Sequence, residues 1–180
     1  FDKRLSYIEV TYPNGSSTTD MVFDRAEIIQ GKEEYDTLPG SYDDNGEVEQ
    51  LVIYLKDRNY NLTLELHYYV YEKCDIITRS AKLVNSGNES VRLERLMSMQ
   101  LDLNESDYEL SFFNGAWARE MNRSRIPIRA GKYVNESVTG TSSNRANPFF
   151  MIGRSSTTED YGECYGFNLI YSGNHYEAAQ

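Results

Sequence analysis

Hydrophobic and polar residues alternate along the middle of the chain. Residues 62–70 place Leu, Tyr and Val at every second position, with Thr, Glu, His and Tyr between them. After a polar break at 72–75, residues 76–84 form a second run, and residues 91–103 form a third run beyond the turn-forming segment 85–88. Successive side chains of a strand point to opposite faces, so each run is expected to bury one face. The pattern predicts three long antiparallel strands joined by short turns.

The rest of the chain predicts more strands and no long helix. Shorter strand-like runs are residues 7–12, 21–23, 51–56, 108–113, 149–152 and 165–171. Residues 26–30 are ambiguous between strand and turn, residues 116–128 are less regular, and Pro127 restricts its segment to a sheet edge or a bulge. Strands and turns at short intervals without helical crossovers favour an all-β, antiparallel β-sandwich. We expect one domain over residues 1–180, and the abrupt ends at Phe1 and Gln180 suggest a piece of a longer protein.

Composition narrows the possible partners. The formal net charge of −10 argues against nucleic acid or an anionic membrane as a partner, because either would be repelled. The 15 tyrosines favour half-buried strands, although they also suit sugar binding. We expect Cys74 and Cys164 to be free, buried thiols of a cytoplasmic protein, with a disulfide between them left open. His67 and His175 stand in no metal-binding spacing, so we expect structural roles for both and no bound metal.

Few residues point to catalysis. No nucleophile motif, phosphate-binding loop or dinucleotide fingerprint occurs, and no cofactor is expected. The acidic segment 43–47 could hold calcium, but it lacks the spaced ligands of a known calcium loop, so we favour a solvated loop. The most unusual segment is 115–120, which contains Trp117, Arg119 and Glu120. An exposed Trp117 with an Arg–Glu pair could stack on a ligand and hydrogen-bond it, whereas a buried Trp117 with a structural ion pair is the commoner arrangement.

Several segments together resemble one protein family. The first is Asp2-Lys3-Arg4, which is similar to that family's G-D-[YF]-R motif, although Phe1 and Lys3 stand in place of its Gly and aromatic residue. The others, in chain order, are Gly31-Lys32, Leu38-Pro39, residues 71–80, Asn85-Ser86-Gly87, residues 115–120, residues 139–143, Asn147-Pro148-Phe149, residues 159–167 and residues 171–174. Their order and spacing extend over nearly the whole chain. They resemble the N-terminal domain of the bacterial α-galactosidases of glycoside hydrolase family 36.

The resemblance implies a large β-supersandwich that precedes a (β/α)₈ barrel in the intact enzyme. It also implies retaining hydrolysis of terminal α-1,6-linked galactose from sugars such as melibiose and raffinose. In that chemistry one Asp attacks the anomeric carbon and a second carboxylic acid protonates the leaving oxygen. Both belong to the barrel, so the chain is expected to be non-catalytic by itself and to have the barrel as its partner.

The resemblance further implies homo-oligomers, as tetramers, in which N-terminal domains shape the active-site mouth of a neighbour. Asp2 is then the expected contact with the α-galactoside, and Trp117, Arg119 and Glu120 are expected scaffold residues around it. A stand-alone carbohydrate-binding module is the alternative, because a tyrosine-rich β-sandwich fits that function equally well. A third hypothesis is a parent enzyme that acts on a related sugar such as α-N-acetylgalactosamine.

Overall fold

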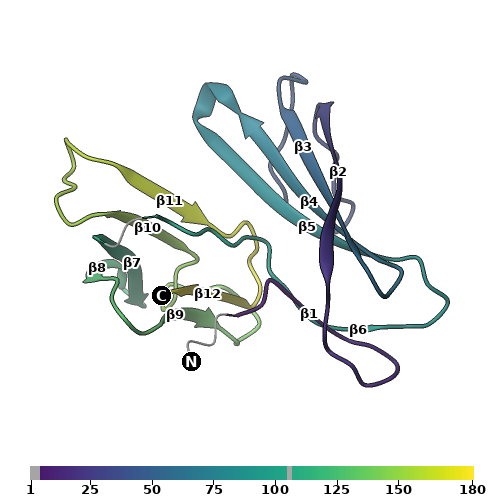
Figure 1. The fold of residues 1–180 in the computed structure, drawn as a ribbon. Helices are drawn as coiled ribbons and strands as arrows, with labels where there is room; N and C mark the ends of the chain where they lie inside the picture. Colours follow the sequence, from purple (N-terminus) through teal and green to yellow (C-terminus); the bar gives the residue numbers. More distant parts are fainter. Residues whose placement is uncertain (1–4, 105–106) are drawn as a thin grey trace. The chain divides into compact units, whose positions relative to one another are not determined.

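The structure, a computed structural model, describes residues 5–104 and 107–180 (Figure 1). The elements, in chain order, are β1 Ile8–Thr11, β2 Met21–Gln30, β3 Glu49–Asp57, β4 Leu62–Tyr71, η1 Glu72–Cys74, β5 Ile76–Asn85, β6 Arg92–Leu96, β7 Tyr108–Ala116, β8 Arg119–Pro127, β9 Tyr133–Ser137, β10 Phe149–Arg154, β11 Cys164–Asn168 and β12 His175–Ala179. All strand pairs are antiparallel, and the predicted all-β class is confirmed. No helix in the described part of the chain is long and apolar enough to cross a membrane.

The described residues divide into two compact units. Unit 1 contains residues 5–35 and 41–101, and unit 2 contains residues 36–40, 102–104 and 107–180. A single domain over residues 1–180 therefore stays a prediction. Each unit combines a four-stranded sheet with a two-stranded ribbon: β2-β3-β4-β5 with β1-β6 in unit 1, and β11-β10-β7-β8 with β12-β9 in unit 2.

Unit 1 packs its ribbon on one face of its sheet. Ile8 and Val10 of β1 and the following Tyr12 form a buried cluster with Leu62 and Leu64 of β4. Leu62 and Leu64 have the same parity on β4, so the alternation of the sequence directly selects this face. Burying an aliphatic side chain of this kind contributes about 1.5–3 kcal/mol.

The turn that leads into β4 is fixed by a buried carboxylate. One oxygen of Asp57 (8% exposed) accepts the backbone N–H groups of Asn59 at 2.8 Å and Tyr60 at 3.1 Å. The other accepts the backbone N–H of Asp20 at 3.0 Å and the hydroxyl of Tyr12 at 3.2 Å. Burial by itself raises the pKa of Asp57, but these four hydrogen bonds together hold that pKa below its usual value.

Two strand predictions need correction. The third long strand over residues 91–103 is wrong: β6 ends at Leu96 and pairs with β1, and no strand covers residues 97–103. The ladder stops where the N–H of Met97 donates to the carbonyl of Tyr7. Conversely, β2 is longer than the predicted 21–23, because a bulge between Phe23 and Arg25 shifts the alternation and hides the strand pattern. Pro127 lies in β8, which is an edge strand as predicted.

The core of unit 2 is smaller. Leu110 and Phe112 of β7 and Ile152 of β10 are its buried residues. Phe150, Phe167 and Tyr133 pack against them, with the rings of Phe112 and Tyr133 only 4.5 Å apart. The β9-β12 ribbon contributes Tyr133 and Ala179 to this cluster, so one face of the ribbon is turned inward.

Candidate functional site

The β7–β8 hairpin carries the candidate residues of segment 115–120. Ala116 pairs with Arg119, so Trp117 and Ala118 form the tip. A Cβ on Gly115 would lie 2.8 Å from the carbonyl oxygen of Arg119 and 3.0 Å from that of Asn144. Real Cβ atoms do not approach backbone atoms so closely. Only glycine therefore fits at position 115, between the start of β8 and the backbone of Asn144.

Trp117 is 91% exposed, so the interpretation of a buried tryptophan is wrong for this structure. The backbone around it is strained: Ala118 and Met121 adopt left-handed conformations with φ of 59° and 56°. The carboxylate of Glu120 accepts the N–H of Ala118 at 2.8 Å and holds the tip in this geometry. Non-glycine residues in this region cost about 1–3 kcal/mol each and cluster at functional sites.

Arg119 and Glu120 do not form the expected ion pair. The Glu120 side chain is used within the tip, while the guanidinium of Arg119 has no hydrogen bond or ion pair with any described residue. Arg123 and Arg145 are also exposed, and their guanidinium groups likewise have no hydrogen bond or ion pair within the described residues. The hairpin therefore carries an exposed apolar ring at its tip and exposed arginines along β8, a combination that suits a polar ring-shaped ligand or a carboxylate-bearing surface.

One other segment of the resemblance contacts this hairpin, and two more contact each other. The backbone N–H of Asn147 donates to the carbonyl of Phe113 at 3.2 Å, and its side chain donates to Met121 Sδ at 3.4 Å. Segments 139–143 and 171–174 are joined by a hydrogen bond from the N–H of Ser142 to the carbonyl of Ser172 and by one from Gly140 to Asn174. Asp2 lies outside the described residues, so its predicted sugar contact stays a prediction.

The remaining candidate groups have local structural contacts. Cys74 and Cys164 are free, as predicted, but both are exposed, so their predicted burial is wrong. His67 is buried between Gln50 and Glu65, with ring nitrogens 2.8 Å and 3.2 Å from them. The Asp43 carboxylate accepts the backbone N–H groups of Glu47 and Val48, and among the described residues no group of three or more metal-binding side chains occurs.

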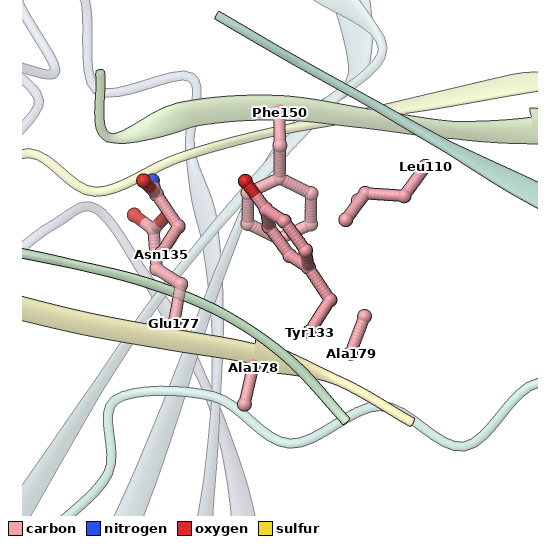
Figure 2. A pocket seen from close by; sticks show the side chains of 7 residues that line it. All are labelled: Leu110, Tyr133, Asn135, Phe150, Glu177, Ala178 and Ala179. Carbon is pink, nitrogen blue, oxygen red and sulfur yellow. The ribbon is translucent and has the colours of Figure 1, made fainter. Parts of the chain in front are cut away.

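Sequence reasoning missed a buried polar cluster on the β9-β12 ribbon. A small cavity is lined by Leu110, Tyr133, Asn135, Phe150, Glu177, Ala178 and Ala179 (Figure 2). The amide of Asn135 and the carboxylate of Glu177 lie together at one end, 2.8 Å apart. Within residues 5–104 and 107–180, the other carboxylate oxygen of Glu177 and both ring nitrogens of His175 are buried without a hydrogen-bond partner. Alternation on β12 places 175, 177 and 179 on one face, but it does not reveal which face is buried.

The family model, the relatives and the solved structures that match this chain all belong to one protein family. Residues 2–180 match the model of the glycosyl hydrolase family 36 N-terminal domain. The α-galactosidase AgaA of Geobacillus stearothermophilus is 38% identical over 174 residues, which are 96% of this chain and 24% of that protein. The solved α-galactosidase of Lactobacillus brevis has a TM-score of 0.94 at 39% identity, covering 98% of this chain and 24% of that one.

A variant of AgaA solved in complex with raffinose has a TM-score of 0.94 at 38% identity, over 98% of this chain and 25% of that chain. This chain thus spans about a quarter of the length of the relatives that it matches. It corresponds to their N-terminal domain, and the matched region does not extend over the remaining three quarters. The chain belongs to the glycosyl hydrolase family 36 N-terminal domain family.

Proposed function

We propose that this chain is the non-catalytic N-terminal domain of an α-galactosidase that releases terminal α-1,6-linked galactose with retention. One observation carries the proposal: 96% of the chain aligns with the α-galactosidase AgaA, at 38% identity. A relative of the same name was solved with raffinose, which is a sugar of this class. The nucleophilic Asp and the acid that protonates the leaving oxygen would both lie on a (β/α)₈ barrel elsewhere in the parent protein.

The contribution of this chain would be support of the fold, homo-oligomer assembly and part of the active-site rim. The β7–β8 hairpin is the region best suited to the rim, because Trp117 is exposed at a tip held by Glu120 and lies two residues before Arg119, whose guanidinium has no partner among the described residues. Asp2 remains the second proposed sugar contact. Two exposed, free cysteines support a reducing, cytoplasmic location.

The test compares hydrolysis of a chromogenic α-galactoside by the full-length parent and by this chain. We expect turnover by the parent only. Turnover by the chain alone would contradict its non-catalytic role, and no turnover by an intact, folded parent would contradict the proposed activity.

The rim is tested in the parent with Trp117→Ala. Loss of a stacking contact worth about 0.5–1.5 kcal/mol lowers kcat/KM roughly 2- to 10-fold, at 1.4 kcal/mol for each factor of ten. Tyr161→Ala is the control, because it removes a ring that is 77% exposed from the β10–β11 loop. Equal kcat/KM for the Trp117→Ala variant and the parent would remove the hairpin from the rim.

A carbohydrate-binding module is the second candidate, favoured by the same exposed Trp117. Titration of the chain with melibiose, followed by tryptophan fluorescence, separates the two. Saturable binding by the chain alone supports the module, and an unchanged signal at high sugar concentration supports the accessory role.

A further inference from the structure

Glu177 is a half-buried carboxylate, and only one of its two oxygens is hydrogen-bonded within the described residues. It lies on β12 directly opposite Asn135 of β9, on the inward face of the ribbon. One oxygen accepts a hydrogen bond from Asn135 Nδ2 at 2.8 Å, and the other is buried and has no partner among the described residues. A buried carboxylate oxygen that lacks a donor raises the cost of keeping the group ionised.

The surroundings of Glu177 are mostly apolar. Leu110 from β7 and Phe150 from β10 face it across the cavity (Figure 2). The titratable groups near it are Tyr133 on β9 and His175 on β12. Burial raises the pKa of Glu177 above its usual value, and the Asn135 amide and His175 lower it by less. The carboxyl therefore changes its charge nearer to neutral pH than an exposed glutamate does.

The Asn135 amide connects this carboxyl to the hairpin. Nδ2 donates to Glu177 and also, at 2.8 Å, to the backbone carbonyl of Asn147. Asn147 in turn holds both strands of the hairpin, through its N–H to the carbonyl of Phe113 and its side chain to Met121 Sδ. Met121 is one of the two left-handed residues beside the Trp117 tip.

We propose that Glu177 is a positioning residue for the Trp117 hairpin, acting through Asn135 and Asn147 and controlled by its own proton. When Glu177 is ionised, its bond to Asn135 is charge-assisted and fixes the amide that also holds Asn147. When a proton from solvent binds to the carboxylate, the bond becomes one between neutral groups and the hold on Asn147 weakens. The positioning is independent of whether the hairpin borders a sugar, a second protein or solvent.

Trp117 is the only tryptophan of the chain, so its single indole N–H peak in a ¹H–¹⁵N NMR spectrum reports the hairpin. The peak is followed between pH 4 and pH 8 together with the ¹³C carboxyl signal of Glu177. We expect both to titrate with the same midpoint, above the value of an ordinary glutamate. An indole peak that does not move while Glu177 titrates would overturn the proposal, and this comparison needs no variant.

Glu177→Gln provides the second measurement, because it keeps the shape of the side chain and removes the titration. We expect the pH-dependent movement of the indole peak to disappear in this variant. The matched control is Glu136→Gln, which makes the same change at an exposed residue next to Asn135 on β9. Movement that persists in Glu177→Gln, or that disappears in the control, would also overturn the proposal.

Discussion

Asp57 in unit 1 and Glu177 in unit 2 are both carboxylates removed from most solvent, but their hydrogen bonding differs. Asp57 accepts four hydrogen bonds, two on each oxygen, from one turn and two neighbouring segments. From the part of the chain that the structure describes, Glu177 accepts one hydrogen bond, and its second oxygen has no partner there. Accordingly the pKa of Asp57 is lowered and that of Glu177 is raised, although burial acts in the same direction on both.

The comparison teaches that the donors around a buried charge decide its role. Asp57 is surrounded by backbone N–H groups that need an acceptor, so its ionised form joins the β3–β4 turn to the segment before β2. Glu177 is lined mostly by apolar side chains, with one shared amide and His175 as the groups that lower its pKa, and burial outweighs them and raises that pKa. The first arrangement fastens a fold, and the second leaves a group that responds to pH.

The largest expected effect is that of Asp57→Ala. The substitution leaves three partly buried backbone N–H groups and the Tyr12 hydroxyl without their acceptor. A hydrogen bond to a charged group contributes about 1.5–3 kcal/mol net, and water replaces part of the loss where the donor is not fully buried. We expect a loss of roughly 3–4 kcal/mol in the free energy of unfolding, measured by urea denaturation with far-UV circular dichroism. Asp44→Ala, at an exposed acidic residue, is the control and should change stability by less than about 0.5 kcal/mol. Equal effects would mean that Asp57 does not fasten the turn.

Acid should weaken unit 1 through the same group. Because the folded state lowers the pKa of Asp57, its contribution is complete above the unfolded value of about 3.9 and is lost as the pH falls through the folded value. Urea midpoints measured between pH 6 and pH 2 should therefore fall less steeply for Asp57→Asn than for the unmodified chain. Parallel curves would show that other carboxylates dominate acid unfolding.

Tyr12→Phe isolates one of the four bonds. The variant removes the hydroxyl that donates to Asp57 but keeps the ring, which is stacked on Tyr60 with centroids 3.5 Å apart. We expect a loss of about 1 kcal/mol by urea denaturation. If this loss persists unchanged in an Asp57→Asn background, the two side chains are not coupled.

The sequence predicted the features of both regions that depend on local pattern. Alternation identified β4 and β5, and the turn-forming residues 85–88 marked the end of β5. Alternation failed at the bulge of β2 and at residues 97–103, because hydrogen-bonding partners distant in sequence decide where a ladder ends. The exposure of Trp117 was not predictable either, since a tryptophan between small residues fits a core as well as a hairpin tip.

The different roles of Asp57 and Glu177 could not be predicted from the sequence either. Both occur next to strand-forming residues, and composition does not distinguish them. What separates them is the set of donors that folding brings to each: three backbone N–H groups and a hydroxyl for Asp57, and a single shared amide for Glu177. Such sets are made by tertiary packing and have no signature within a few residues of either position.

Glu177→Gln should have the smallest effect on the free energy of unfolding, and this effect should be stabilising, unlike those of the Asp57 and Tyr12 variants. A carboxyl whose pKa is raised by folding contributes its full stability at low pH and loses it as the pH rises through the folded value. The neutral glutamine avoids this loss, so the variant should match the unmodified chain near pH 4 and exceed it by up to about 1 kcal/mol near pH 8. Urea denaturation followed by Trp117 fluorescence measures this in unit 2, with Glu136→Gln as the control. The opposite result would be a stability difference between variant and unmodified chain that falls from pH 4 to pH 8. It would mean that folding stabilises the ionised carboxylate, and Glu177 would then not differ from Asp57.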